Sequence, residues 1–181
     1  YGYLLHDWHD SATNKVIRFN PAKPTKYKTQ AEILKFVYAG EYVDGTYYCY
    51  DSNGYLYKVD PKSWTYRQVG KADSKIVEMA FDYTDNTMYG ISSTGHSTNL
   101  VRINLNTGET TTLGSQNSKI VAMTCVPSDD FKTAKLYAIN EDSKLVTLDK
   151  TSGKDTVDAD SSKYNIPKVE YVQSMTYDYN S

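Results

Sequence analysis

The sequence contains little of several features that distinguish classes of protein. Cys49 and Cys125 are the only two cysteines among 181 residues, which excludes a framework of several disulfides. No apolar run approaches the roughly 18 residues that a membrane helix needs, so we expect no membrane insertion. Lysine and arginine total 20 against 22 acidic residues, and this balance provides no basic surface for nucleic acid.

The sequence patterns of common catalytic and cofactor sites are also missing. There is no glycine-rich phosphate loop, no CxxC pair and no calcium-loop pattern, so we expect no cofactor and no metal. No serine lies in a strand-turn-helix elbow. The adjacent acids Asp129-Asp130 and Glu141-Asp142 are more typical of solvated turns than of glycosidic catalysis. We therefore assign no catalytic residue.

Tyrosine, in contrast, is abundant, with 18 tyrosines against 4 phenylalanines. A tyrosine-rich chain with few thiols is typical of an extracellular protein, so we predict a secreted or cell-surface location. The start at Tyr1 without a methionine indicates a processed product or a piece of a longer precursor. Cys49 and Cys125 lie in apolar segments of different repeats, where buried free thiols are expected more often than a disulfide.

An internal repeat is the most informative feature of the sequence. Four short apolar segments begin about 40 to 45 residues apart, and each ends in Asp or Asn before a turn. A side-chain hydrogen bond from that last residue is expected to close each turn. The four segments are Val16–Asn20, Leu56–Asp60, Leu100–Asn104 and Leu145–Asp149.

Further motifs precede and follow these segments. A tyrosine-led strand comes before each one, at residues 3–5, 48–50, 89–91 and 137–139. An earlier apolar strand is clearest at 75–81 and 119–125, with weaker copies at 36–39 and 172–177. A polar fourth strand follows at 65–69 and 110–113. With no sustained helical spacing of apolar residues, each unit of about 40 to 48 residues predicts one four-stranded propeller blade.

The third unit carries a resemblance to a known class of repeat. Its Phe81-Asp82-Tyr83, Leu100–Ile103 and Asn106-Thr107-Gly108 segments resemble the repeats of secreted and cell-surface bacterial β-propellers. The Gly-His and Trp-Asp marks of WD repeats and the glycine pairs of kelch repeats are lacking. The resemblance implies an all-β propeller fold with four recognisable blades and names no chemistry.

A single propeller domain is therefore predicted over residues 1–181. In one alternative the C-terminal strand closes the first blade of the same chain, which removes exposed strand edges. In the other, the chain is part of a larger propeller, completed by a second copy or another propeller fragment. The predicted blades are 172–181 plus 1–30, 31–72, 73–116 and 117–171.

Ligands of propellers generally meet the loops at one face or the central channel. The loops between second and third strands, and those between blades, are expected on a common face. Trp8, between two His and Asp neighbours, fits contact with a sugar or a peptide, whereas metal binding is disfavoured because no second pair has ligand spacing. The candidate ligand-binding residues are Asp7, Trp8, His9, Asp51, His96 and Tyr164.

The expected function is a non-enzymatic extracellular binding or adhesion module that holds a protein or a glycan through this loop face. One alternative is a structural role as an assembly part of a larger propeller. Another is a carbohydrate-active enzyme domain with acids in the central pocket. The expected partners are an extracellular protein or glycan, with a homodimer or another propeller fragment as further candidates.

Overall fold

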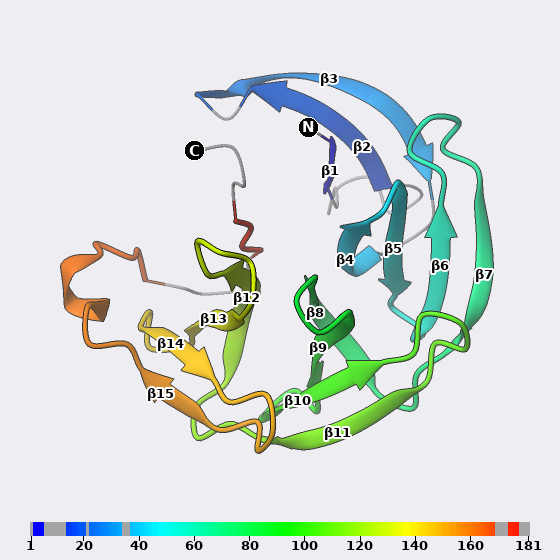
Figure 1. The fold of residues 1–181 in the computed structure, drawn as a ribbon. Coiled ribbons are helices and arrows are strands. Elements are labelled where there is room, and N and C mark those ends of the chain that lie inside the picture. The colour runs from blue at the N-terminus through cyan, green and yellow to red at the C-terminus, as the bar shows by residue number, and fades with distance from the viewer. Residues whose placement is uncertain (1, 6–13, 21, 34–36, 169–173, 178–181) are drawn as a thin grey trace.

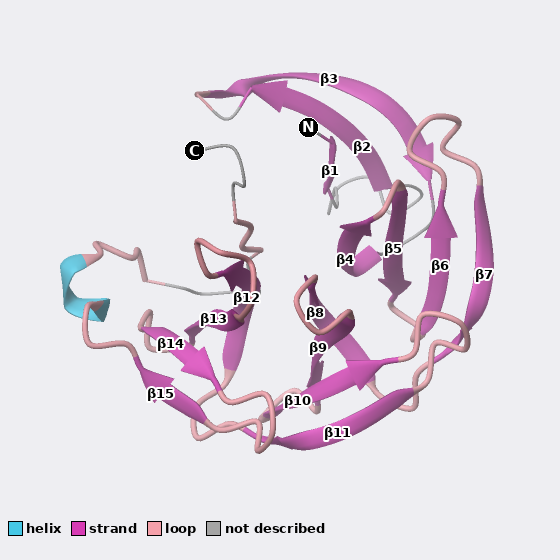
Figure 2. Ribbon diagram, viewed as in Figure 1, coloured by secondary structure: helices cyan, strands magenta, loops and turns pink. Residues whose placement is uncertain are grey.

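The computed structural model describes residues 2–5, 14–20, 22–33, 37–168 and 174–177. These residues form antiparallel sheets arranged around a common centre (Figure 1). The only helix among them is a short 3-10 turn, η1 (Ser161–Lys163) (Figure 2). The all-β prediction is therefore confirmed.

Four sheets follow one another along the chain. The first contains β1 (Gly2–Leu5), β2 (Asn14–Asn20) and β3 (Lys23–Ile33). The second contains β4 (Val37–Val43), β5 (Thr46–Asp51), β6 (Tyr55–Val59) and β7 (Tyr66–Lys71). The third contains β8 (Lys75–Asp82), β9 (Thr87–Ser93), β10 (Thr98–Ile103) and β11 (Thr110–Ser115). The fourth contains β12 (Ile120–Pro127), β13 (Ala134–Asn140), β14 (Leu145–Leu148) and β15 (Asp155–Val157).

The strand motifs of the sequence appear in the predicted order. In each four-stranded sheet the strands pair with their neighbours in sequence, and the first strand lies nearest the centre (Figure 1). β8 is the most extensively buried of these innermost strands, from Ile76 to Asp82, because it lies between β4 and β12. β3 continues to Ile33, beyond the predicted end of the first blade at residue 30.

Adjacent sheets pack face to face, and pairs of residues that lie opposite one another on neighbouring strands form each contact. Tyr50 and Leu56 lie opposite one another on the second sheet and are fully buried. They pack in one cluster with Met88, Val101 and Ile103 of the third sheet. The face of each sheet that packs on the following sheet is called its trailing face below.

The same contact recurs one sheet later. Ile91 and Leu100 lie opposite one another on the trailing face of the third sheet and are also fully buried. They pack with Leu136 and Val146 of the fourth sheet. Similarly, the first sheet contacts the second through Val16, whose cluster includes Cys49 and Val59. Successive repeats therefore bury the same positions against one another.

The predicted turn-closing hydrogen bonds are present in all four sheets. In each case the side-chain Oδ1 of the Asp or Asn accepts a hydrogen bond from the backbone N–H two residues later. The distances are 2.9 Å at Asn20, 2.8 Å at Asp60, 2.9 Å at Asn104 and 3.0 Å at Asp149. The recurrence of these residues in sequence is explained by turn geometry.

Ring closure by the C-terminal segment stays a prediction. Residues 174–177 form no strand, while residues 172, 173 and 178–181 lie outside the described residues. The first sheet contains three strands in the described part of the chain, and β1 pairs there with β2 alone. Cys49 and Cys125 are buried free thiols, as predicted.

Two glycines allow the outer strands to approach the next sheet closely. A Cβ atom on Gly70 of β7 would lie 1.6 Å from the carbonyl oxygen of Thr107. A Cβ atom on Gly114 of β11 would lie 1.9 Å from the carbonyl oxygen of Ser152. Both contacts are with backbone in the turn between the third and fourth strands of the following sheet, so a side chain would force the two sheets apart.

Replacing Gly114 with Ala should therefore destabilise the fold by about 1–3 kcal/mol, as overpacking does elsewhere. Urea denaturation followed by circular dichroism measures this change. Thr112→Ala is the control, because Thr112 is exposed on the same strand. An equally stable Gly114→Ala protein would show that the turn and the strand are not in close contact.

Candidate functional site

The structure brings part of the predicted loop face together. Lys119 donates a hydrogen bond from Nζ to the carbonyl oxygen of Gly95 at 2.9 Å, and its backbone N–H donates to Glu141 Oε1 at 3.3 Å. Ser143 Oγ donates to the carbonyl oxygen of Pro167 at 3.0 Å. The β9–β10 loop, the β11–β12 connection, the β13–β14 loop and the segment after η1 therefore share one face.

The predicted ligand-binding residues have different positions. Asp7, Trp8 and His9 lie outside the described residues. His96 is exposed in the β9–β10 loop, and Tyr164 is exposed just after η1. Both stay predicted binding residues on the loop face.

Asp51, the remaining candidate, is buried and holds the β5–β6 turn. Its Oδ1 accepts backbone hydrogen bonds from Asn53 and Tyr55, both at 2.9 Å. Asn140 makes the same two bonds in the β13–β14 turn, from Asp142 at 3.1 Å and Lys144 at 2.9 Å. Because the same geometry recurs in two repeats, the turn explains why an Asp stands at position 51.

A second surface, which the sequence did not predict, lies at the opposite ends of the innermost strands. A cavity of about 550 Å³ is lined there by the ends of β4, β8 and β12 and by residues near the C-terminus. We call it the aromatic cavity. Its lining includes Glu41, Tyr42, Phe81, Asp82, Tyr83, Thr124, Cys125, Pro127, Phe131, Ala134, Thr176 and Tyr177.

The rim of the aromatic cavity is rich in exposed rings. The exposed fractions are 52% for Tyr42, 48% for Tyr83, 59% for Phe131 and 37% for Tyr177. The Tyr83 ring packs edge-on against Phe81, with 4.8 Å between ring centroids. The rings come from different parts of the chain: Tyr42 lies within β4, Tyr83 follows β8, Phe131 follows β12 and Tyr177 belongs to the C-terminal segment. Only the folded arrangement therefore brings them together.

Two carboxyl groups lie along the innermost strands, of which Glu41 is half-buried and Glu78 is buried. Burial raises the pKa of Glu41 to about 7, although backbone hydrogen bonds from Tyr42 and Phe81 oppose the shift. Burial also raises the pKa of Glu78 well above its ordinary value, against a hydrogen bond from the backbone of Met123, and the charge of Glu41 adds to the increase. The hydrogen bonds to Phe81 and Met123 each join one innermost strand to the next.

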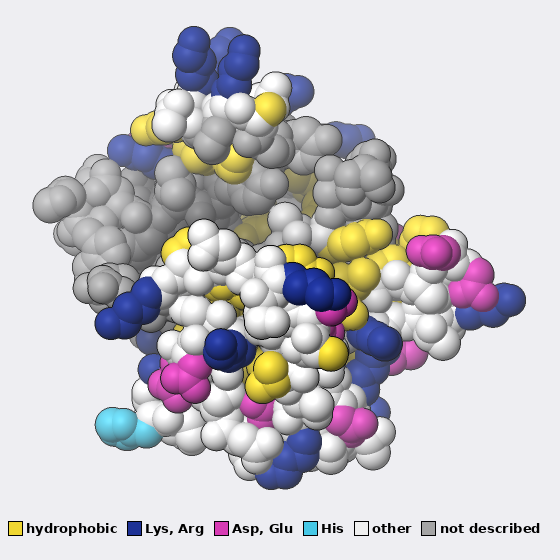
Figure 3. Space-filling model, turned by 90° about the vertical axis from the view of Figure 1, so that its left-hand side faces the viewer, with side chains coloured by type: hydrophobic (Ala, Val, Ile, Leu, Met, Phe, Trp, Pro, Cys, Tyr) yellow, Lys and Arg dark blue, Asp and Glu magenta, His cyan; other side chains and the backbone are white. Residues whose placement is uncertain are grey.

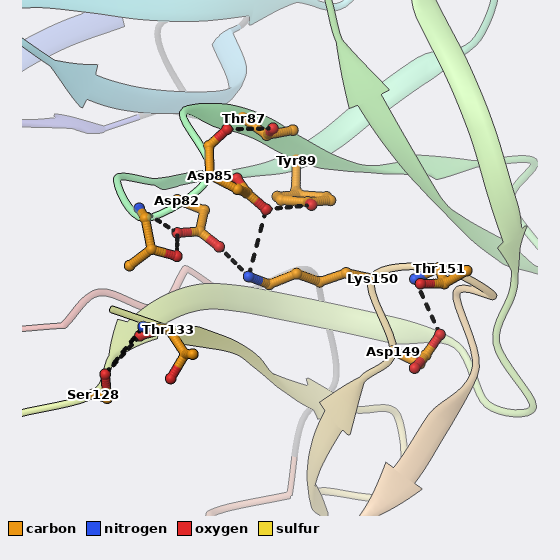
Figure 4. Close-up of polar contacts among 10 residues, drawn as sticks. Asp82, Asp85, Thr87, Tyr89, Ser128, Thr133, Asp149, Lys150 and Thr151 are labelled. Carbon is orange, nitrogen blue, oxygen red and sulfur yellow. Dashed lines mark hydrogen bonds and ion pairs between the residues drawn. The ribbon is translucent and has the colours of Figure 1, made fainter. Parts of the chain in front are cut away.

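An ion pair joins the third and fourth sheets beside the cavity (Figure 4). Lys150, from the β14–β15 turn, pairs with Asp82 at the end of β8 and with Asp85 at 3.6 Å. Tyr89 donates a hydrogen bond to Asp85 at 2.9 Å. Burial alone would raise the pKa of Asp82, but the bonds from Lys150 and Thr84 together lower it.

The described residues contain no group of three or more His, Cys, Asp or Glu side chains placed to hold a metal ion. Burial raises the pKa of both cysteine thiols to about 12, which disfavours the reactive thiolate. No helix within the described part of the chain is long and apolar enough to span a membrane.

Comparison with known proteins supports the architecture. A chain in the crystal structure of a nidogen/laminin complex matches with a TM-score of 0.59 and 13% identity, over 81% of this chain and 58% of that chain. This chain has a β-propeller fold. The N-terminal domain of Nup159 also matches, with a TM-score of 0.47 and 11% identity, over 87% of this chain and 40% of that chain.

Neither a protein-family model nor a curated protein sequence matches the propeller. The chain spans little more than half of the matched nidogen/laminin chain and less than half of the Nup159 chain. At this identity the likeness concerns the fold alone. The function of the propeller must therefore be argued from its own surfaces.

Removing the ammonium group of Lys150 should destabilise the propeller, because the Asp82 side chain is 0% exposed and would lose its countercharge. We expect Lys150→Met to lower the free energy of unfolding by about 2–4 kcal/mol. Urea denaturation at pH 7 measures the loss. Lys132→Met is the control, since Lys132 and Asp130 form an exposed pair, and its denaturation midpoint should not move. Equal midpoints for the two variants would contradict a structural role for Lys150.

The raised pKa values also predict a pH dependence of stability. Folded Glu41 keeps its proton up to about pH 7, whereas in the unfolded chain it loses the proton near its ordinary pKa of 4.5. The folded state therefore binds more protons between these values, and stability should fall as pH rises through this window. Glu78 acts in the same direction.

The variant Glu41→Gln should remove part of this dependence. We expect it to be more stable than wild type at pH 8 by on the order of 2 kcal/mol, and equally stable at pH 4. Urea denaturation at a series of pH values tests this, with the exposed Glu32→Gln as the control. A wild-type stability that rises from pH 4.5 to 7 in parallel with that of Glu41→Gln would refute the assignment.

Proposed function

We propose that this propeller is a protein-binding module that holds a segment of a partner protein in the aromatic cavity. The observation that carries the proposal is the rim of exposed rings from Tyr42, Tyr83, Phe131 and Tyr177 around one cavity. Aromatic side chains supply large contact areas at low entropic cost and are enriched at binding hot spots. A cavity of about 550 Å³ has room for one or two side chains of a partner segment.

The aromatic rings and carboxyl groups of the lining favour a partner segment that combines an apolar side chain with a basic one. Glu41 is about half ionised at pH 7, and a nearby cation would favour its ionised form. Asp82 is neutralised by Lys150, but Glu41 takes part in none of the four ion pairs found among the described residues. A cationic side chain stacked on the tyrosines would gain cation–π attraction. It would also place a positive charge near the Glu41 carboxyl.

A protein partner agrees with the fold comparison, since the matched nidogen/laminin structure is that of a complex. An extracellular setting for this chain is part of our proposal, on the composition of its sequence. Recognition of a glycan through Trp8, His96 and Tyr164 on the loop face is the other form of binding that the sequence suggests. The aromatic cavity has the stronger structural support, because its rings converge on a single hollow.

A carbohydrate-active role receives less support from the arrangement of acids. Glycosidic chemistry requires two carboxyl groups flanking the sugar, roughly 5 to 10 Å apart. Glu41 and Asp82 line the cavity, but Asp82 is paired with Lys150, and Glu78 is not part of the lining. Glu78 is also 6% exposed and accepts a backbone hydrogen bond from Met123, so a sugar ring in the cavity would not meet a second free carboxylate.

A peptide library displayed on phage tests the proposed function directly. Peptides selected on the wild-type propeller should contain basic and aromatic or aliphatic residues, and calorimetry should show that Tyr83→Ala/Phe131→Ala weakens their binding at least about tenfold. Tyr27→Ala is the matched control, because Tyr27 is as exposed as these rings but lies on the outer strand β3.

The result also separates the two candidate surfaces. Binding that survives in Tyr83→Ala/Phe131→Ala but is lost in Trp8→Ala/Tyr164→Ala would contradict the aromatic cavity and favour the loop face. Thermal denaturation of each variant confirms that loss of binding is not loss of folding.

A further inference from the structure

The β2–β3 hairpin concentrates positive charge in a chain that is acidic as a whole. Residues 14–33 contain five basic side chains and one acidic side chain, a local net charge of +4 in a chain whose net charge is −2. Lys and Arg side chains gather at the top of the view in Figure 3, where Figure 1 places the first sheet. The basic residues are Lys15, Arg18, Lys23, Lys26 and Lys28, and the acidic residue is Glu32.

The register of the hairpin brings like charges together. Arg18 of β2 lies directly opposite Lys28 of β3, and both residues are exposed. Lys26 lies two positions before Lys28 on the same strand, so its side chain is on the same face. Like charges at opposite positions of an antiparallel pair destabilise the pair. None of the ion pairs found in the described part of the chain includes a residue of the hairpin, so this repulsion is not offset there.

β3 also provides a long strand edge. Among the described residues it pairs with β2 alone, and residues 25–30 are all exposed. β3 has 11 residues, whereas the outermost strands β7, β11 and β15 of the other sheets have 6, 6 and 3. The outward-pointing N–H and C=O groups of a long exposed edge are a template for another extended strand.

Protection of this edge from unwanted pairing explains only part of the charge pattern. Lysines on an edge strand deter aggregation, and Lys26 and Lys28 fit that role. Arg18, however, belongs to the central strand of the first sheet, where edge protection requires no charge. Its position opposite Lys28 collects charge from two strands at one place. An anionic partner would replace this repulsion with attraction.

We propose that β3 is a docking edge for an extended acidic segment of a partner protein. The segment adds to the first sheet as a further strand beyond β3, with an acidic residue at every second position. These acidic residues then lie on the face that carries Arg18, Lys26 and Lys28. Backbone hydrogen bonds to the β3 edge hold the segment, and the alternating charges select it. This surface is separate from the aromatic cavity, whose described lining includes no residue of the first sheet.

A peptide of four Glu-Thr repeats tests the proposal. Calorimetry should detect its binding to the wild-type propeller, and the affinity should fall as salt is added. The control peptide has the same composition in two blocks, four Glu followed by four Thr. It should bind at least about fivefold more weakly, because an extended block of Glu places its carboxylates on both faces. Equal binding of the two peptides would overturn strand addition, since a diffuse charge attraction does not depend on residue order.

Charge reversal tests the docking residues. The variant Arg18→Glu/Lys28→Glu should bind the Glu-Thr peptide at least about tenfold more weakly than wild type, and should bind a Lys-Thr peptide more tightly than wild type does. The gain of binding shows that the variant is folded. The matched control is Lys62→Glu/Lys154→Glu, which changes the net charge equally at exposed lysines of the second and fourth sheets and should retain the Glu-Thr peptide. Equal losses in the two double variants would overturn the docking edge, because only net charge would then matter.

Hydrogen exchange distinguishes a paired strand from a charge contact. The Glu-Thr peptide should slow exchange at the β3 amides that do not bond to β2, because strand addition gives these amides acceptors. Exchange in β7, the outermost strand of the second sheet, should stay the same. Binding of the peptide without protection in β3 would overturn the proposed strand addition.

Two further measurements separate this surface from other binding modes. Tyr83→Ala/Phe131→Ala should retain the Glu-Thr peptide, so failure of the aromatic cavity as a binding site and failure of the β3 edge are distinguishable. Retention of the wild-type propeller on phosphatidylglycerol vesicles, without binding of the Glu-Thr peptide, would mean that the hairpin meets a lipid surface. That result would overturn a protein partner for β3.

Discussion

The packing of one sheet on the next is the interaction on which the rest of this propeller depends. The pairs Tyr50–Leu56 and Ile91–Leu100 lose all their exposed surface between sheets, and burial of this kind is the main source of folding free energy. Both faces of a sheet must be covered, so no single repeat could form this core alone. The close approach at Gly114 shows how little space separates consecutive sheets.

This packing also determines the chemistry near the centre. The innermost strands are crowded, so a carboxyl group there loses water and needs another partner. Glu41 and Glu78 find backbone N–H groups on the next strand, and Asp82 finds Lys150 from the next sheet. These three carboxyl groups therefore bond to the following repeat and help to join one repeat to the next. The ends of β4, β8 and β12 are different, because aromatic rings surround a cavity there.

The sequence was sufficient to predict features that depend on neighbouring residues or on repetition. The strands around Tyr89 and Leu100, and the turn bonds of Asp60 and Asp149, recur at a fixed spacing and follow from local geometry. The aromatic cavity could not be found in this way. Tyr42 lies in a strand, Phe131 lies in a loop and Tyr177 lies near the C-terminus. They share no spacing in the sequence, so only the curvature of the assembled sheets brings them together. Tyr83 directly follows β8, but no aromatic residue directly follows β4 or β12, so the repeat gave no signal of this cavity.

The predicted closure of the ring and the aromatic cavity both involve the C-terminal segment. Tyr177 forms part of the cavity rim, and it belongs to the weaker copy of the innermost-strand motif at residues 172–177 of the sequence. Fixing the backbone of this motif in a strand would restrict the orientation of the Tyr177 ring before a partner binds, and a pre-organised ring loses less entropy on binding. Binding to the cavity and completion of the ring should then favour each other, because both order the same residues.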